Sequence, residues 1–464
     1  MLTYSFENKG KDSLYESLYK QIKADILDGI LMPGEKLPSK RALAKHLSVS
    51  TITVESAYGQ LSAEGYLYSV PKSGYFVADI SSYKPMSAPK ASHITPVAAQ
   101  TPEYFMNFVS NSTSADRFPF SSWAKMSRET ISCHTGSLVE RSPSMGIYAL
   151  RLAISNYLYQ FRGMTVDPEQ IIVGAGTEYL YGLLVQLLGH DKLYAVEDPG
   201  YQTITKIYQA NHVNCVPIPI DHHGVMTNAL LASGADILHI SPSHHFPTGI
   251  VTPISRRYEL LNWASSAGRY IIEDDYDSEF RFRGKPIPPL YNADTSDKVI
   301  YINTFSKSLA STIRISYLVL PKPLLAKYKE TLSFYSCTVS NFEQYTLAKF
   351  IEEGYLEKHI NRMRNYYRNL LDKILTYIKK QPASSSKITV LEKDAGLHFL
   401  MKVKTSICDK ELVERAASQG ILISCLSQYY ANPDTHDSHT IVINYSGICI
   451  QNVEEAIDRL FSVI

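Results

Sequence analysis

The sequence predicts an α/β protein of two domains, a small winged helix-turn-helix at the N-terminus and a larger domain of alternating strands and helices. A chain of 464 residues is too long for one hydrophobic core. Residues 13–77 contain short helix patterns joined by tight turns and then two β-prone runs. From about residue 105 onward, short apolar runs alternate with helical patterns, as in a sheet covered by helices on both faces.

The composition is that of an ordinary globular protein, with 45% hydrophobic and 20% charged residues. A formal net charge of +1 gives no overall attraction to nucleic acid, so any DNA contact has to come from a local basic cluster. The six cysteines are widely spaced without a Cys-x-x-Cys pair, which favours reduced, packed thiols over a disulfide framework or a metal site. No apolar run approaches the roughly 18 residues that span a bilayer, and the first residues lack a secretion-signal pattern. We therefore expect a cytoplasmic protein without a membrane segment.

The first 80 residues contain the helix and turn signals in order. Residues 13–30 carry apolar side chains four apart, which predicts one amphipathic helix that Pro33-Gly34 ends. Ser39 can cap a second helix, and Ser50 can cap a third after a tight turn. Residues 66–77 are typical of a hairpin, the wing of such a domain.

In a helix-turn-helix, the second helix of the pair, here the one that Ser50 can cap, enters the major groove of DNA with its N-terminal residues. Basic residues nearby reach phosphates or the minor groove. The alternative is a solvated helical hairpin that serves as an interaction module. If the segment binds DNA, the residues expected to contact it are Ser39, Lys40, Arg41, Ser50, Thr51, Thr53, Lys72 and Gly74.

Residues 80–104 change character, with four prolines and no sustained period, and are typical of a linker. Such a segment reaches on the order of 25–30 Å, enough for the N-terminal domain to dock on a neighbouring subunit. The expected domains are therefore a DNA-binding domain at 1–79, a linker at 80–104 and a large domain at 105–464. Within the last, helical residues 345–374 and a mixed pattern after them predict a smaller C-terminal lobe.

The stretch "LMPGEKLPSKRALAKHLSVSTITVESAYGQLSAEGYLYSVPKSGYFV" closely resembles the winged-helix domain of the GntR family. The resemblance implies binding to a double-stranded DNA operator. Family members often carry an arginine where this chain has Thr51, so a bidentate guanine contact from that position is absent and the base preference does not carry over.

Three motifs of the large domain directly follow short apolar runs. Gly174-Ala-Gly-Thr-Glu178 opens a helix whose backbone N–H groups can hold a phosphate. Asp274-Asp-Tyr276 and Lys307 each follow a further run. Alone, each motif has an ordinary explanation as a turn, a helix cap or a solvated lysine. A lysine, a carboxylate and a phenol at neighbouring strand ends can hold pyridoxal phosphate, and their order favours that interpretation.

This part of the chain resembles the fold-type I aminotransferases over about 360 residues. The resemblance implies that Lys307 forms an imine with the cofactor aldehyde, that Asp274 keeps the ring nitrogen protonated, and that Tyr276 donates to the phenolic oxygen. The phosphate and the ring face would be held by Gly176, Thr177, Tyr201, Thr304 and Arg314.

The whole chain resembles the MocR subfamily of GntR-type transcription regulators, most closely in "HHFPTGIVTPISRR", "RYIIEDDYDSEFRF" and "TFSKSLASTIRISYLVLP". The resemblance implies a homodimer, domain-swapped so that each N-terminal domain rests on the partner's large domain. It also implies that the cofactor imine receives a small effector, either pyridoxal phosphate itself or an amino compound.

The chain departs from working aminotransferases at two positions. Their Asn-Pro-Thr-Gly motif reads Phe246-Pro-Thr-Gly here, which removes a hydrogen bond to the phenolic oxygen. Their C-terminal arginine, which binds the substrate carboxylate, is matched by Val442 within residues 440–446, removing an anchor of about 1.5–3 kcal/mol. Transaminase activity is therefore expected to be vestigial.

Three hypotheses follow from these features. The first is a cofactor-dependent transcription regulator, the second a working aminotransferase with an accessory DNA-binding domain, and the third a DNA-binding scaffold with an unused pocket. The missing arginine counts against the second, and the intact Lys307, Asp274, Tyr276 and Arg314 count against the third. Within the first, a pocket without a carboxylate clamp favours sensing of pyridoxal phosphate over sensing of an amino acid.

Overall fold

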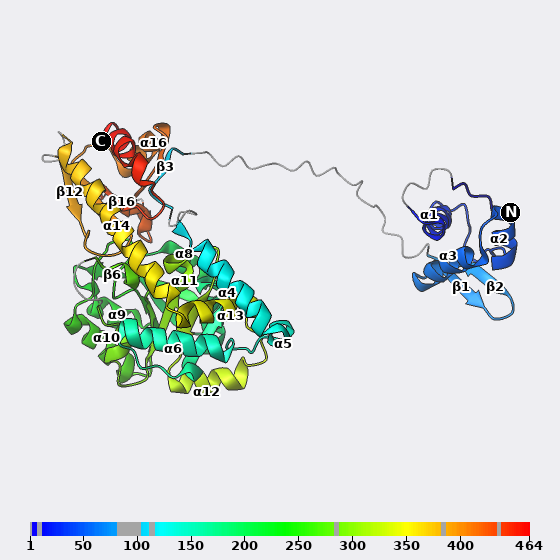
Figure 1. Cartoon of the computed structure of the whole chain (residues 1–464), viewed down its shortest axis with the longest axis horizontal. Coiled ribbons are helices and arrows are strands. Elements are labelled where there is room, and N and C mark those ends of the chain that lie inside the picture. Colours follow the sequence, from blue (N-terminus) through cyan, green and yellow to red (C-terminus); the bar gives the residue numbers. More distant parts are fainter. Residues whose placement is uncertain are drawn as a thin grey trace. The chain divides into compact units, whose positions relative to one another are not determined.

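The computed structural model describes residues 2–6, 12–80, 104–110, 117–282, 287–381, 387–433 and 438–464. The chain divides into two compact units, residues 1–100 and 101–464 (Figure 1). The linker expected at 80–104 lies outside the described residues except at its two ends.

The N-terminal unit is a winged helix-turn-helix, as predicted. It contains α1 (Leu14–Leu27), α2 (Lys40–Leu47) and α3 (Thr51–Ala63), followed by the antiparallel hairpin of β1 (Leu67–Val70) and β2 (Gly74–Val77). Ser13, Ser39 and Ser50 cap the three helices, each accepting a hydrogen bond from a backbone N–H of the first turn. Ser48 ends α2 in a left-handed conformation (φ 56°), which turns the chain into α3 within three residues.

The larger unit is built on an eight-stranded sheet in the order β4-β11-β10-β9-β8-β5-β6-β7. Strands β10, β9, β8, β5 and β6 are parallel neighbours, whereas β11 runs antiparallel to both β10 and β4. The strands are β4 (Ile171–Gly174), β5 (Leu193–Asp198), β6 (Asn214–Asp221), β7 (Gly224–Val225), β8 (Ile237–Ile240), β9 (Tyr270–Asp274), β10 (Val299–Thr304) and β11 (Ser316–Val319).

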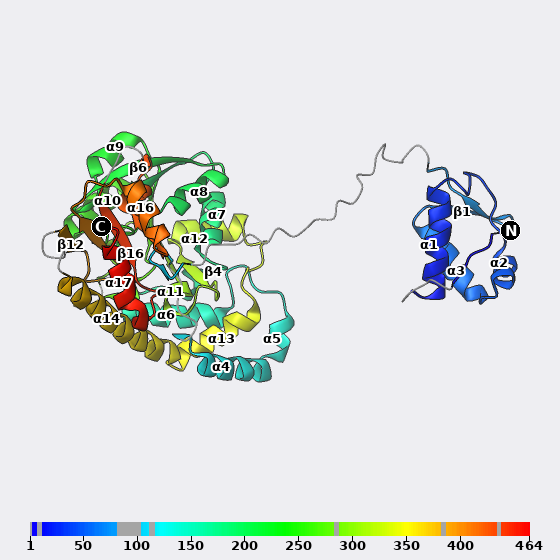
Figure 2. The same cartoon turned by 90° about the horizontal axis from the view of Figure 1, so that it is seen from above.

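Helices cover both faces of this sheet, as predicted (Figure 2). Alternate strand residues face different cores: Val173 and Tyr317 pack with α6 and α13, whereas Ile172 and Leu318 pack with α7 and α12. The helices are α4 (Phe120–Cys133), α5 (Thr135–Val139), α6 (Tyr148–Arg162), α7 (Thr177–Leu188), α8 (Gln202–Ala210), α9 (Thr227–Ser233), α10 (Ile254–Ser266), α12 (Lys322–Thr331), α13 (Asn341–Glu352) and α14 (Tyr355–Lys380).

A smaller C-terminal lobe packs on α14. Its antiparallel sheet has the order β12-β13-β16-β15, formed by β12 (Ile388–Leu391), β13 (His398–Val403), β16 (Thr440–Asn444) and β15 (Ser424–Cys425). Helices α16 (Asp409–Ser418) and α17 (Val453–Phe461) and the short parallel pair of β14 (Ile421–Leu422) and β3 (Met106–Asn107) complete it. One face of β13 and β16 lies in the lobe's core, whereas the other carries His398, Leu400, Val442 and Asn444.

Two further observations concern expectations from composition. Among the described residues, no helix has both the length and the apolar content needed to cross a membrane. Of the six cysteines, all of which are among the described residues, Cys425 alone is buried, as expected for a packed thiol. Cys133, Cys408 and Cys449 are exposed.

Candidate functional site

Lys307 lies on a single turn of helix, α11 (Phe305–Ser308), directly after the central strand β10. The turn begins at Thr304, whose hydroxyl accepts hydrogen bonds from the Ser306 N–H (3.1 Å) and the Ser316 hydroxyl (2.8 Å). Thr304 therefore shapes the turn that carries the lysine. Burial lowers the pKa of Lys307 to about 8, although the nearby carboxylates of Asp277 and Asp274 act in the opposite direction. Its amine is thus poised to act as a nucleophile near neutral pH.

Asp274 is the last residue of β9, beside β10 in the sheet, and is buried. Its Oδ2 atom accepts a hydrogen bond from the Tyr181 hydroxyl of α7 and lies 3.6 Å from Nε2 of His239. Its Oδ1 atom has no hydrogen-bond partner among the described residues. A buried carboxylate oxygen without a partner fits a protonated ring nitrogen, such as that of pyridoxal phosphate.

The N-terminus of α7 and Arg314 form an anion-binding corner. Gly176 precedes the helix with a φ of 93°, and a Cβ atom there would lie 2.5 Å from Nη2 of Arg314, so the guanidinium rests directly against the glycine backbone. Thr177 is the first residue of the helix, and the Arg314 side chain pairs with Glu178 at 2.7 Å. Because a helix N-terminus and a guanidinium both attract phosphate, this corner fits the phosphate of the same cofactor.

Aromatic side chains line the next part of the site. The Tyr276 hydroxyl lies 3.4 Å from Nδ1 of His244, and burial together with Asp277 holds the pKa of Tyr276 well above its usual range. Tyr201 is half exposed and packs edge-on against Phe246, with ring centroids 5.9 Å apart. Phe246 in turn packs edge-on against His398 of the C-terminal lobe. Phe246, His398 and His244 thus link Tyr201 to Tyr276, although these residues come from different segments of the chain.

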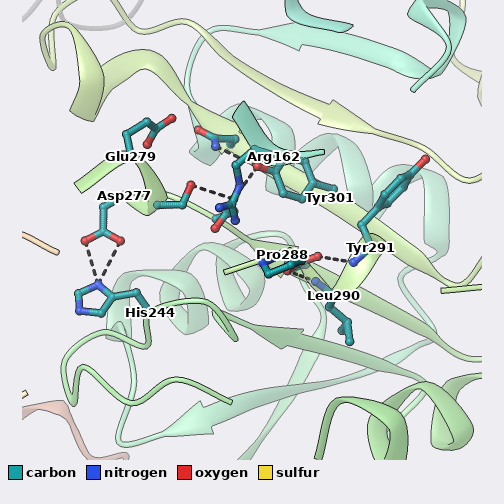
Figure 3. A network of polar contacts seen from close by, with 12 residues as sticks. Arg162, His244, Asp277, Glu279, Pro288, Leu290, Tyr291 and Tyr301 are labelled. Atoms are coloured by element: carbon teal, nitrogen blue, oxygen red, sulfur yellow. Dashed lines mark hydrogen bonds and ion pairs between the residues drawn. The ribbon is translucent and has the colours of Figure 1, made fainter. Parts of the chain in front are cut away.

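Sequence reasoning missed a buried group formed by His244, Asp277 and His398. Nδ1 of His244 lies 2.9 and 3.1 Å from the two carboxylate oxygens of Asp277, and Figure 3 shows the two side chains facing each other. The His398 ring lies 4.8 Å from the His244 ring. The first two belong to motifs already noted for other residues, but His398 gives no local signal, because a histidine on an apolar strand is usually a packed core residue.

A second buried network, also absent from the sequence predictions, holds the two residues that flank Asp274. Arg162 forms an ion pair of 2.7 Å with Asp275, and the Tyr301 hydroxyl donates to the same carboxylate at 2.6 Å (Figure 3). The carboxylate of Glu273 accepts hydrogen bonds from the N–H groups of Leu290 and Tyr291. These contacts fix the end of β9, and so they fix the position from which Asp274 projects.

The structure also places the residues expected to contact DNA. Ser39 and Ser50 are helix caps, the Ser50 and Thr53 hydroxyls lie 2.8 Å apart, and Lys40 pairs with Glu55 at 2.5 Å. Arg41, Thr51 and Lys72 are exposed, Lys72 at the tip of the wing, and Gly74 begins the second wing strand. The most exposed apolar side chain of α3 is Ile52, at 74% exposure.

Comparisons with known proteins agree with both units. Residues 14–77 match the gntR family of bacterial regulatory proteins, and residues 104–460 match the class I and II aminotransferases. The chain is 38% identical to the uncharacterized HTH-type transcriptional regulator YdeL of Bacillus subtilis, over 96% of both chains. It is 31% identical to the probable rhizopine catabolism regulatory protein MocR of Rhizobium meliloti, over 97% of this chain and 93% of that protein.

It is also 31% identical to the pyridoxine biosynthesis transcriptional regulator PdxR of Corynebacterium glutamicum, over 90% of this chain and 89% of that protein. Among solved structures, the multiple substrate aminotransferase of Thermococcus profundus matches with a TM-score of 0.68 and 23% identity, covering 83% of this chain and 98% of that one. At this identity the structural match shows a shared fold alone.

Proposed function

Because the chain belongs to the MocR-type transcription regulators, in which a GntR-type winged helix precedes an aminotransferase-like domain, we propose that its operator binding is controlled by pyridoxal phosphate held at Lys307. The observation that carries the proposal is that the Lys307 amine, with its lowered pKa, and an Asp274 carboxylate oxygen without a hydrogen-bond partner among the described residues lie at the ends of neighbouring strands. Pyridoxal phosphate, when bound, supplies an aldehyde that a lysine amine can capture.

Each residue of the site has a role in this proposal. Lys307 supplies the nucleophilic amine, and Asp274 accepts the hydrogen bond of the protonated ring nitrogen. Arg314 and the N-terminus of α7 hold the phosphate, and Tyr276 provides a hydroxyl for the phenolic oxygen. Tyr201, half exposed and packed edge-on against Phe246, covers the ring.

The same pocket is poorly suited to transamination. Val442 lies on β16 in register with Leu400 of β13 and Ser424 of β15, is 1% exposed, and cannot bind a substrate carboxylate. Phe246 cannot donate or accept a hydrogen bond at the position where aminotransferases carry asparagine. We therefore assign the large domain a sensory role and expect negligible turnover.

The proposed partner of the N-terminal domain is a double-stranded operator, bound in the cytoplasm by a homodimer whose N-terminal domains rest on the partner's large domain. Ligand binding in the large domain changes operator affinity only as far as the ligand prefers one state of the dimer over the other. The proposed ligand is pyridoxal phosphate or a small amino compound. The name of PdxR, a pyridoxine biosynthesis regulator, supports the first of these.

The test uses DNA from upstream of the neighbouring genes, first in footprinting and then in titrations with and without pyridoxal phosphate. We expect Lys307→Ala to abolish the visible absorbance of the bound cofactor and its effect on operator affinity, while DNA binding itself remains measurable. The matched control is Lys327→Ala, an exposed lysine on α12. Production of a keto acid at enzymatic turnover, or an unchanged cofactor response in Lys307→Ala, would contradict the proposal.

A further inference from the structure

The charges around Lys307 are unusual for a pocket that binds amino acids. The ionised groups that act on its amine are the carboxylates of Asp277 and Asp274. Asp274 serves the ring nitrogen in the proposed function, which leaves Asp277 as the carboxylate facing an effector. A carboxylate in this position favours a cation on the effector.

Two histidines, His244 and His398, lie beside Asp277. Nδ1 of His244 lies 2.9 Å from the Asp277 carboxylate, so this nitrogen carries a proton and donates a hydrogen bond to the carboxylate. Burial, with smaller effects from His244 and His245, holds the pKa of His398 well below its usual range, so the His398 ring is neutral and one of its nitrogens can accept a hydrogen bond. Nε2 of both histidines is buried and has no hydrogen-bond partner in the described part of the chain. Asp277 and His398 therefore offer hydrogen-bond acceptors to a donor on the effector.

The described residues lack a carboxylate-binding arginine at position 442, where the chain has valine. Val442 lies on the same sheet face as His398, since His398 pairs with Asn444 and Leu400 with Val442 in the register of β13 and β16. The guanidinium of Arg162 is already paired with Asp275. Arg281 and Asp277 line a cavity of about 10 Å³, which has room for about one water molecule. A buried carboxylate without a cation is costly.

We propose that the effector recognised beside the cofactor is a small amine that carries a second cationic, hydrogen-bond-donating group and no carboxylate, such as a diamine. Asp277, His244 and His398 bind the donating end. This inference rests on the proposed function, because the effector shares its pocket with the cofactor at Lys307.

The experiment compares ornithine with putrescine and lysine with cadaverine, two pairs that differ by the α-carboxylate. The full-length protein loaded with pyridoxal phosphate is titrated with each compound, and both the visible absorbance of the bound cofactor and the affinity for operator DNA are recorded. We expect the diamines to reach half-saturation at concentrations at least about tenfold lower than the parent amino acids, because each tenfold corresponds to about 1.4 kcal/mol.

Asp277→Asn is expected to reduce this preference to less than about twofold, and His398→Leu supplies the same test if the first variant does not fold. Asp372→Asn, on the exposed side of α14, is the matched control and should behave like the wild type. Three outcomes would overturn the inference: the amino acids bind as well as the diamines or better, both pocket variants keep the preference, or none of the four compounds has an effect. In each case a normal spectrum of the bound cofactor would still uphold the proposed function. Absence of a cofactor spectrum overturns the proposed function and this inference with it.

Discussion

The guanidinium of Arg314 lies against the backbone of Gly176, so close that a Cβ atom at position 176 would stand 2.5 Å from Nη2. Gly176 follows β4, and Arg314 precedes β11, the strand that pairs with β4 in an antiparallel register. The sheet therefore places a cation beside the N-terminus of α7. Gly176 also has a φ of 93°, a conformation that L-residues other than glycine rarely adopt. Both the space and the backbone conformation require glycine here.

Replacing Gly176 with alanine is expected to displace Arg314 and to weaken binding of pyridoxal phosphate at least about tenfold, the scale of one charge-assisted hydrogen bond. An absorbance titration with the cofactor measures the effect. Gly136→Ala is the control, since a Cβ atom there meets nothing within 4 Å. Arg314→Ala should cause a similar loss, and the double variant should lose little more than either single variant. Full additivity would show that the two residues act separately.

The depressed pKa of Lys307 predicts a pH dependence for cofactor capture. Burial lowers this pKa to about 8, and only the uncharged amine attacks an aldehyde. The rate constant for capture should rise about tenfold per pH unit below pH 8 and level off above it, whereas a free lysine side chain continues to rise toward its pKa of about 10.4. Stopped-flow absorbance measures the protein rate constant, with N-acetyl-lysine as the reference that corrects for ionisation of the cofactor.

The effect of Asp277 on the pKa of Lys307 predicts a change in this pH dependence. The carboxylate of Asp277 favours the charged form of Lys307, so Asp277→Asn should move the midpoint of this pH profile to lower pH. A profile that rises in parallel with N-acetyl-lysine would contradict the assignment of a lowered pKa to the Lys307 amine.

The sequence predicted the site residues that directly follow apolar strands, because a strand end and a helix start each leave a local pattern. Asp274 and Lys307 are of this kind. His398 is not, because it reaches His244 only through the packing of the C-terminal lobe on the large sheet. The flanking acids Glu273 and Asp275 likewise gave no sign of their buried partners, which come from distant segments.

Some elements of the fold were hidden for local reasons. Strand β6 contains Pro217 and Pro219, and these prolines obscured its strand pattern in the sequence. Because they are two residues apart, their backbone nitrogens, which lack a hydrogen to donate, point to the same side of the strand, away from β5. The helical pattern expected at 345–374 comprises two helices, α13 and α14, because Gly354 adopts a φ of 73° between them. Periodicity continues across such a break, so the sequence pattern did not reveal it.

The buried pair of Arg162 and Asp275 predicts a large effect on stability. Their side chains are 4% and 1% exposed, and removal of one partner leaves an uncompensated buried charge. Arg162→Met should lower the free energy of unfolding of the large domain by about 3–5 kcal/mol. Urea denaturation followed by circular dichroism measures this loss. Arg415→Met, which breaks an exposed pair with Glu411 on α16, is the control and should change stability little.

The exposed side chain of Ile52 predicts how α3, the helix expected to enter the major groove, contacts the operator. At the start of α3, the Ser50 and Thr53 hydroxyls hydrogen-bond each other and Glu55 pairs with Lys40, whereas Ile52 is 74% exposed. An apolar side chain in the major groove contacts thymine methyl groups, and loss of such a contact costs about 1 kcal/mol. Ile52→Ala should therefore weaken operator binding roughly fivefold in gel-shift titrations.

The decisive control changes the DNA instead of the protein. An operator in which deoxyuridine replaces thymine at single positions lacks one methyl group at a time. The wild type should lose affinity at one or two positions, and Ile52→Ala should be insensitive at those same positions, because the contact is already missing. If no thymine methyl matters to the wild type, Ile52 does not read bases. Weaker binding by Ile52→Ala would then reflect a displaced helix, which a thermal unfolding measurement of the N-terminal domain would detect.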